Sequence, residues 1–95
     1  MNLRKHAQNR YQCQIRLPGC EVGPTCLAHL RTVETGMGQK EIDILGAWAC
    51  PSCHNIVDGR GLQPEGYSRQ DILFAFYEGI FRTQKILVQD KIVKW

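Results

Sequence analysis

Five cysteines in a chain of 95 residues are the residues best suited to bind a metal. Cys50 and Cys53 have two residues between them, a spacing that lets two thiolates reach one zinc ion. Such an ion needs two more ligands, and Cys13, Cys20 and Cys26 are the candidates. Spacing alone does not choose among them. We favour Cys13 with Cys20, because a Pro-Gly turn between them can bring both sulfurs together. The prediction is a structural zinc held by four thiolates, with Cys26 left as a small buried apolar residue.

A redox pair is the alternative interpretation of Cys50 and Cys53. Thioredoxin-type motifs follow a strand and open a long helix in a βαβ unit, whereas this sequence has no parallel βαβ pattern and three further cysteines. The alternative predicts reversible oxidation of the pair and no bound zinc. We favour zinc because a chain of this size has a small hydrophobic core, and structural zinc supplies about 10 to 16 kcal/mol of apparent binding energy.

Two histidines and an aspartate form the second group with potential chemistry. His54 directly follows Cys53, and Asp58 comes four residues later, so in a helix both side chains project from one face and could hold a divalent ion. His29 lies on a predicted strand that would return across from that helix. Each residue also has an ordinary structural interpretation, since His54 could support the zinc site and Asp58 could be a solvated helix residue.

Short elements must position these residues. Residues 26–30 and 42–49 are predicted strands, and a glycine-containing loop over 31–41 separates them. One or two helical turns are expected over 55–58, before the glycines that follow. A connector rich in turn residues, over 61–67, then leads to the last element.

That last element is one long helix. Ser68, with Asp71 three residues later, has the arrangement of a capping box. The predicted core stripe is Leu73, Phe76, Tyr77, Ile80, Gln84 and Leu87. A second row, with a spacing of seven residues, contains Phe74, Phe81 and Val88. We favour packing of this row over the zinc lobe of the same chain, and a homodimer through the helix is the alternative.

Positive charge is concentrated near the N-terminus. The formal net charge is +3, and the first acidic residue is Glu21. A basic segment with Arg4, Arg10 and Arg16 suits a polyanion such as DNA, and phosphate contacts carry little sequence information. The length excludes a large enzyme with a cofactor-binding domain. No apolar run approaches the roughly 20 residues of a membrane span, and the first residues lack the apolar region of a secretory signal. We therefore expect a protein of the reducing cytoplasm, with no membrane partner.

The order of these features resembles the ββα-metal (HNH) nucleases, which are built on a treble-clef zinc scaffold. A cysteine pair is followed by a strand ending in His29, a second strand over 43–49, and Cys50-Pro51-Ser52-Cys53-His54. The resemblance to the small YbcO-like prophage nuclease family is closer and extends from Leu3 to the end of the long helix. It is carried by Arg10-Tyr11-Gln12-Cys13-Gln14-Ile15-Arg16-Leu17-Pro18-Gly19, Leu27-Ala28-His29-Leu30-Arg31, Cys50-x-x-Cys53-His54 with Asp58, and Arg82-Thr83-Gln84.

The resemblance implies a role for each site residue. His29 matches the general base, and His54 matches a ligand of the catalytic metal, with Asp58 as its helical partner. Asp43 stands where the HNH pattern usually has Asn, and it would brace the loop that carries the base. Many such nucleases have an acidic or histidine ligand immediately before the base. This chain has Ala28 there, so the expected catalytic metal site lacks one ligand.

The implied chemistry is hydrolysis of a phosphodiester bond, which needs an activated water and screening of the negative charge in the transition state. A Mg²⁺-like ion, held by His54 and Asp58 with several waters, would contact the phosphate. Zinc suits the four thiolates instead, so we expect the two metals to differ. Arg31, two residues beyond His29, could clamp the phosphate through two hydrogen bonds.

We therefore predict an α+β fold, in which a small treble-clef or ββα-metal zinc domain is followed by one long C-terminal helix. Residues 1–95 form a single domain, with a zinc lobe over 1–60, a connector over 61–67, and the helix over 68–95 with a short tail that could add an edge strand. The predicted function is a metal-dependent DNA endonuclease of low sequence specificity. The alternative is a zinc-stabilised DNA- or protein-binding module without catalysis, which Ala28 favours.

Overall fold

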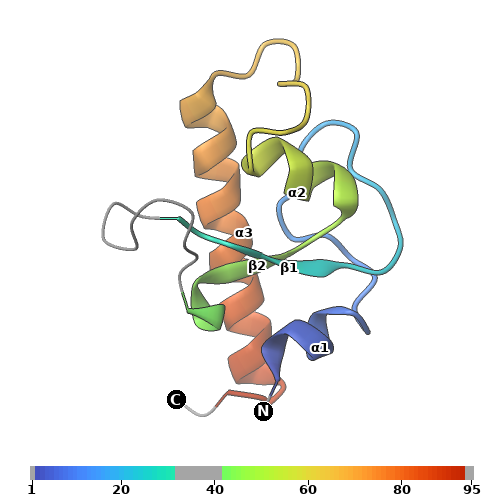
Figure 1. Cartoon of the computed structure of the whole chain (residues 1–95). Coiled ribbons are helices and arrows are strands. Elements are labelled where there is room, and N and C mark those ends of the chain that lie inside the picture. The colour runs from blue at the N-terminus through green and yellow to red at the C-terminus, as the bar shows by residue number, and fades with distance from the viewer. Residues whose placement is uncertain (1, 32–41, 94–95) are drawn as a thin grey trace.

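A computed structural model of the chain consists of a small antiparallel sheet with helices packed around it (Figure 1). It describes residues 2–31 and 42–93. The elements are α1 (Leu3–Ala7), β1 (Cys26–His29), the 3₁₀ helix η1 (Asp43–Leu45), β2 (Gly46–Ala49), α2 (Pro51–Val57) and α3 (Arg69–Gln89). The predicted α+β class and long C-terminal helix are confirmed. Within the described part of the chain, no helix has both the length and the apolar character to cross a membrane.

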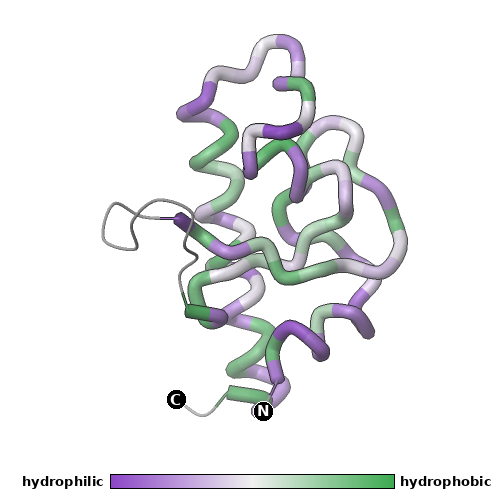
Figure 2. The backbone as a smooth tube through the Cα atoms, viewed as in Figure 1, coloured by the Kyte–Doolittle hydropathy of each residue, from purple (hydrophilic) through white to green (hydrophobic). Residues whose placement is uncertain are grey.

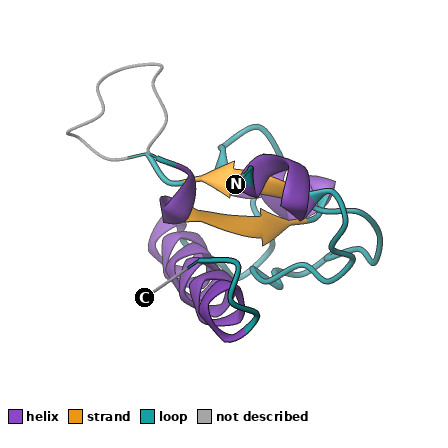
Figure 3. Ribbon diagram, turned by 90° about the horizontal axis from the view of Figure 1, so that it is seen from below, coloured by secondary structure: helices purple, strands orange, loops and turns teal. Residues whose placement is uncertain are grey.

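The two strands pair antiparallel along four residues each. Successive side chains of a strand point to opposite faces, so Cys26 and Ala28 share one face of β1 while Leu27 and His29 share the other. Ala28 belongs to the core cluster that includes α2, and Leu27 belongs to a second cluster with α1 and Trp48. Figure 3 shows α3 running alongside this sheet. The sheet therefore separates the surroundings of Cys26 from those of His29.

The outer edge of β2 is closed by α3 and by the chain that follows α1. The N–H of Gln14 donates to the Trp48 carbonyl at 2.8 Å, and the N–H of Trp48 donates to Thr83 Oγ1 at 3.1 Å. The Thr83 hydroxyl in turn donates to the Gly79 carbonyl at 2.8 Å. A Cβ on Gly79 would lie 2.9 Å from Ile15 Cγ1, so only glycine allows this approach of the chain to the helix.

The predicted second strand is too long. It begins at Gly46 rather than at residue 42, because its partner β1 ends at His29, which lies opposite Gly46. Residues 43–45 therefore have no strand to pair with and form η1 instead. Of the loop predicted over 31–41, residues 32–41 lie outside the described residues.

The predicted start of the short helix is also wrong. α2 begins at Pro51, four residues before the predicted start at residue 55. Proline suits the first position of a helix, and Cys50 serves as the N-cap, with its sulfur accepting the N–H of Cys53. The cysteine pair is thus part of the helix start.

The start of α3 is as predicted, but its buried face is rotated from the predicted stripe. Ser68 and Asp71 form a complete capping box. The buried residues of α3 are Ile72, Phe76, Gly79, Ile80, Thr83 and Leu87. Tyr77 is exposed, and Ile72 is buried although the predicted stripe omits it. Figure 2 shows apolar and polar segments alternating along this helix.

The second apolar row of α3 is exposed. Phe74, Phe81 and Val88 have 64%, 66% and 37% of their surface accessible. The favoured interpretation, in which this row packs over the zinc lobe of the same chain, is therefore wrong. The lobe instead packs on the side of α3 that carries Gly79, where the missing side chain admits the neighbouring chain.

The end of α3 differs from the prediction of an edge strand in the tail. Lys91 adopts a left-handed conformation with φ 59°, and its N–H donates to the Val88 carbonyl at 3.1 Å. The N–H of Ile92 donates to the Leu87 carbonyl at 2.9 Å, which completes a Schellman motif. Residues 91–93 thus cap the helix and form no strand, and residues 94–95 lie outside the described residues.

A short N-terminal helix, α1, was not predicted. Its first turn is capped by the Asn2 side chain, which accepts the N–H of Lys5 at 3.0 Å. Ala7 is fully buried, and its carbonyl accepts the Thr25 hydroxyl at 2.7 Å. A helix of five residues is too short to show a repeating apolar face in the sequence.

Replacing Thr83 with Val should destabilise the fold by about 1 to 3 kcal/mol, because it leaves the buried N–H of Trp48 without an acceptor. The measurement is the free energy of unfolding in urea for the zinc-loaded protein. Thr83→Ser is the matched control, since it keeps the hydroxyl, and it should lose less stability than Thr83→Val. Equal stability of the wild type and Thr83→Val would contradict the role given to this hydrogen bond.

Candidate functional site

The structure brings together the four cysteines that we favoured as zinc ligands. The sulfurs of Cys13, Cys20, Cys50 and Cys53 all lie within 4.8 Å of one another. The Cys20 and Cys50 sulfurs are 3.9 Å apart, and sulfurs at about 2.3 Å from a tetrahedral zinc ion would be about 3.8 Å apart. The donor set and its spacing therefore fit zinc. Cys26 is not a member of this group.

Turns and a helix start position these sulfurs. Gly19 adopts φ 84°, and the N–H of Cys20 donates to the Leu17 carbonyl at 3.0 Å, so a tight turn precedes Cys20. The Cys50 sulfur accepts the backbone N–H groups of Glu21 and Cys53, each at 3.4 Å. These hydrogen bonds link the turn that carries Cys20 to the start of α2.

The pKa values of the clustered cysteines show that each thiolate affects the ionisation of its neighbours. A hydrogen bond from Cys53 lowers the pKa of Cys13, and that same bond, followed by burial, raises the pKa of Cys53. Partial burial, together with the hydrogen bond and charge of Cys13, raises the pKa of Cys20. One thiolate thus disfavours ionisation of its neighbours, and a divalent metal bound among them would favour their charged forms.

His54 and Asp58 are also brought together, as their spacing predicted. His54 Nε2 lies 3.2 Å from Asp58 Oδ2, and both side chains are partly accessible. Asp58 Oδ2 also accepts a hydrogen bond from Arg60 Nη2 at 2.9 Å. The other ring nitrogen, His54 Nδ1, lies 2.9 Å from the sulfur of Cys26. Burial raises the pKa of the Cys26 thiol, so this group is a neutral thiol near pH 7.

The contacts of Cys26 and Arg60 were not found by sequence reasoning. Cys26 was predicted to be a buried apolar residue, but it is only partly buried and contacts His54. The position of Cys26 on β1 partly indicates the contact with His54, because alternate side chains of a strand that faces a helix lie against that helix. Nothing in the spacing of Arg60 identifies Asp58 as its partner.

His29 is directed away from His54. It is 5% exposed, and its Nε2 lies 2.7 Å from Asp43 Oδ1. Asp43 also accepts a hydrogen bond from Arg4 Nε at 3.2 Å, which places this group on the side of the sheet that faces α1. The hydrogen bond from His29 lowers the pKa of Asp43. Asp43 therefore braces His29 directly, through its side chain, and the two histidines lie on opposite faces of β1.

Ala28 lies between Cys26 and His29 in the sequence and is fully buried. Its side chain belongs to the core cluster that contains Ile56 and Val57 of α2. A carboxylate or imidazole at this position would have to share that apolar cluster. The chain thus places a core contact where the resemblance leads one to expect a metal ligand.

Arg10 has a structural role that its place in the basic segment did not indicate. Its guanidinium lies 4.7 Å from the centre of the Trp48 ring and donates to Asp90 Oδ2 at 2.8 Å and to His6 Nε2 at 3.2 Å. These contacts join the end of α1 to β2 and to the end of α3. Arg10 is therefore largely engaged within the fold.

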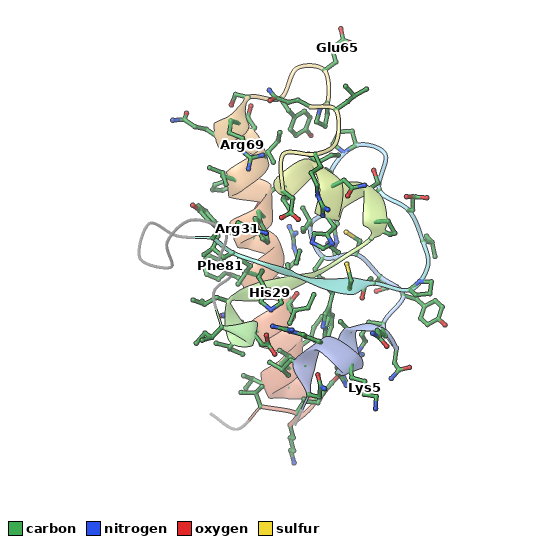
Figure 4. All side chains as sticks on the ribbon, in the orientation of Figure 1. Lys5, His29, Arg31, Glu65, Arg69 and Phe81 are labelled. Carbon is green, nitrogen blue, oxygen red and sulfur yellow. The ribbon has the colours of Figure 1, made fainter. Side chains whose placement is uncertain are left out.

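Three other arginines named as DNA contacts are accessible. The Arg4 side chain is 63% exposed, although it bonds Asp43. Arg16, with φ 63°, and Arg31 are also exposed. Figure 4 shows His29 at the end of β1 and Arg31 just beyond it, with α1 and Lys5 on the side toward which His29 points.

Comparisons with known proteins give consistent matches over nearly the whole chain. A family model described as "Putative nuclease YbcO" matches residues 1–91. The chain is 38% identical to "Putative nuclease YbcO" of Escherichia coli (strain K12), with 98% of this chain and 97% of that protein covered. "Putative nuclease ybcO" of Enterobacteria phage 82 gives the same identity and coverage. A solved structure, "Structure of a putative bacteriophage protein from Escherichia coli str. K-12 substr. MG1655", matches with a TM-score of 0.74 and 31% identity, over 95% of this chain and 100% of that chain.

Zinc binding to the metal-free protein should release protons, because thiols must lose theirs to bind a metal, and zinc affinity should therefore fall as the pH falls. The measurement is proton release, followed with a pH indicator during zinc titration. Cys53→Ser should lose most of the zinc affinity, whereas Cys26→Ser, the matched control, should retain one zinc per chain. Loss of zinc from Cys26→Ser, or its retention by Cys53→Ser, would contradict the four-cysteine assignment.

Proposed function

The chain belongs to the family described as "Putative nuclease YbcO", and from that premise we propose that it is a metal-dependent DNA endonuclease of the HNH type. The observation that carries the proposal is the pair of His54 Nε2 and Asp58 Oδ2, which lie 3.2 Å apart at the C-terminal end of α2, the helix that begins at the four-cysteine group. The order β1, β2, α2 around these cysteines fits a treble-clef scaffold with one structural zinc. We place the protein in a reducing cytoplasm, where its five free cysteines remain available for metal.

The spacing of His54 and Asp58 fits one divalent ion. Two donors that each lie about 2.1 Å from an octahedral ion, at right angles, are about 3.0 Å apart. Water and phosphate oxygens, the ligands that Mg²⁺-like ions prefer, would complete the coordination. Because one ligand is an imidazole, the site could also bind Ni²⁺ or Mn²⁺. Bound there, the ion would supply stabilisation of the negative charge on the phosphate in the transition state.

His29 is the proposed general base. The Asp43 carboxylate can only accept a hydrogen bond, so the Nε2 of a neutral His29 carries the proton and Nδ1 is left to accept one. In the reaction, Nδ1 takes a proton from the attacking water, whose oxygen forms the new P–O bond while the P–O bond to the leaving oxygen breaks. Because His29 is buried and lies on the opposite face of β1 from His54, this role requires DNA binding to open its surroundings and to bring the base and the ion to one phosphate.

DNA is the proposed substrate, held mainly through its phosphates. Arg4, Arg16 and Arg31 are the exposed candidates for these contacts, and Arg31 lies nearest in sequence to the proposed base. Arg10 contributes less, because Trp48 and Asp90 occupy its guanidinium. Contacts of this kind do not read bases, which is why we propose low sequence specificity.

The zinc-loaded protein should nick supercoiled plasmid DNA when Mg²⁺, Mn²⁺ or Ni²⁺ is added. His29→Ala should lower the rate by about 10² to 10⁴-fold through loss of the base, and His54→Ala should remove the metal-dependent activity. Asn55→Ala is the matched control, because Asn55 is exposed on the same helix. The measurement is the conversion of supercoiled to nicked plasmid over time.

A zinc-stabilised DNA- or protein-binding module is the second candidate function. The burial of His29 and the apolar surroundings of Ala28 favour it, since neither suits a catalytic centre. The same assay separates the two candidates. Retained DNA binding, without metal-dependent nicking by the wild type, would support the module and overturn the endonuclease.

We also propose that a second copy of the chain covers the exposed row of α3. Phe74 and Val88 each lie seven residues from Phe81, so antiparallel pairing about Phe81 would place Phe74 of one copy beside Val88 of the other. Glu78 and Lys85 flank this seam on opposite sides of Phe81, and the pairing would bring their opposite charges together. The row is thus complementary to itself in the order of its apolar residues and in charge.

Phe81→Glu should convert a dimer to a monomer, because it places like charges at the centre of the seam. Leu62→Glu is the matched control, since Leu62 is 94% exposed and lies in the connector. The measurement is sedimentation equilibrium of the zinc-loaded protein over a range of concentrations. A wild type that stays monomeric at the highest concentration would overturn the dimer.

A further inference from the structure

We propose that Cys26 is a positioning residue that sets the orientation of the His54 ring. Its sulfur holds the Nδ1 side of the imidazole, so that Nε2 points toward Asp58 and the divalent ion. This inference rests on the proposed function, because it assigns a role around the proposed catalytic ion.

Three elements bring Cys26 and His54 together. Cys26 opens β1 and pairs with Ala49, the last residue of β2. Cys50 then serves as the N-cap of α2, and His54 lies one helical turn later. The resulting distance from Cys26 Sγ to His54 Nδ1 is 2.9 Å, and that from Cys26 Sγ to the Ala49 carbonyl is 3.6 Å. The sulfur thus sits between a ring nitrogen and a backbone acceptor.

A neutral thiol can serve either tautomer of the ring. When Nε2 carries the proton, the thiol S–H can donate to Nδ1. When Nε2 ligates a metal, Nδ1 carries the proton and donates to the sulfur, while the S–H turns to the Ala49 carbonyl. The contact is kept in both states, and in the second it fixes the ring in its ligating orientation. Partners of this kind hold metal-ligating histidines in many proteins.

The geometry disfavours Cys26 as a direct ligand of the same ion. Cys26 and Asp58 face opposite nitrogens of His54. In the described residues, the four-cysteine group is also the only set of three or more candidate donors that all lie within 4.8 Å of one another. One ion could not contact the Cys26 sulfur, a single ring nitrogen and Asp58 without rearrangement.

The test is Mn²⁺ binding to the zinc-loaded protein, followed by electron paramagnetic resonance of free Mn²⁺. Cys26→Ala should weaken Mn²⁺ binding by about 10 to 100-fold, while zinc content stays at one per chain. Cys26→Ser keeps a group that can donate and accept, so it should restore most of the affinity. Nitrogen-15 shifts of the His54 ring provide a second measurement. With a diamagnetic ion such as Mg²⁺, they should show the Nδ1–H tautomer in the wild type and a loss of this preference in Cys26→Ala.

The outcomes separate this inference from the proposed function. Unchanged Mn²⁺ affinity in Cys26→Ala, with binding by the wild type, would overturn the positioning role alone. Absence of a Mn²⁺ site in the wild type would overturn both the ion site and the inference. With Co²⁺ as the probe, a thiolate-to-metal absorption band that is present in the zinc-loaded wild type and absent from Cys26→Ser would place the sulfur on the ion and overturn the positioning role.

Discussion

The rest of this structure depends on the close approach of four cysteine sulfurs, those of Cys13, Cys20, Cys50 and Cys53. Two of them come from irregular chain around Cys13 and Cys20, and two come from the start of α2. The strands are only four residues long, and a two-stranded sheet of this size is marginal without further support. A cation would allow these sulfurs to be charged together, so a metal bound there would supply stabilisation that the small core lacks.

The same contact fixes the groups with potential chemistry. His54 follows Cys53 by one residue, so the four-cysteine group determines where its backbone lies, and Cys26 and Asp58 lie against the two nitrogens of its ring. A change at the cysteines would therefore alter both stability and the proposed ion site. Cys26 is separated from that group but contacts His54 of the same helix, so the fifth cysteine borders the proposed ion site.

Sequence reasoning found features that depend on local spacing and missed features that depend on packing. The cysteine pair, the pairing of His54 with Asp58, and the capping box at Ser68 are short-range patterns, and the structure has all three. The rotation of the buried face of α3 could not be predicted, because it follows from the close approach of distant chain to Gly79. Likewise, the charge of Arg10 was visible in the sequence, but its stacking on Trp48 was not.

The burial of Ala28 explains why the proposed catalytic ion would depend on its substrate. The inward face of β1 at this position belongs to the core beneath α2, so a charged ligand there would be desolvated among apolar side chains. Among the described residues, the proposed ion has two protein donors, His54 on α2 and Asp58 at its C-cap. An ion with two protein ligands needs oxygen donors from elsewhere, and a DNA phosphate supplies them. In the proposed enzyme, DNA binding would thus complete the metal site, which makes metal affinity and substrate affinity parts of one equilibrium.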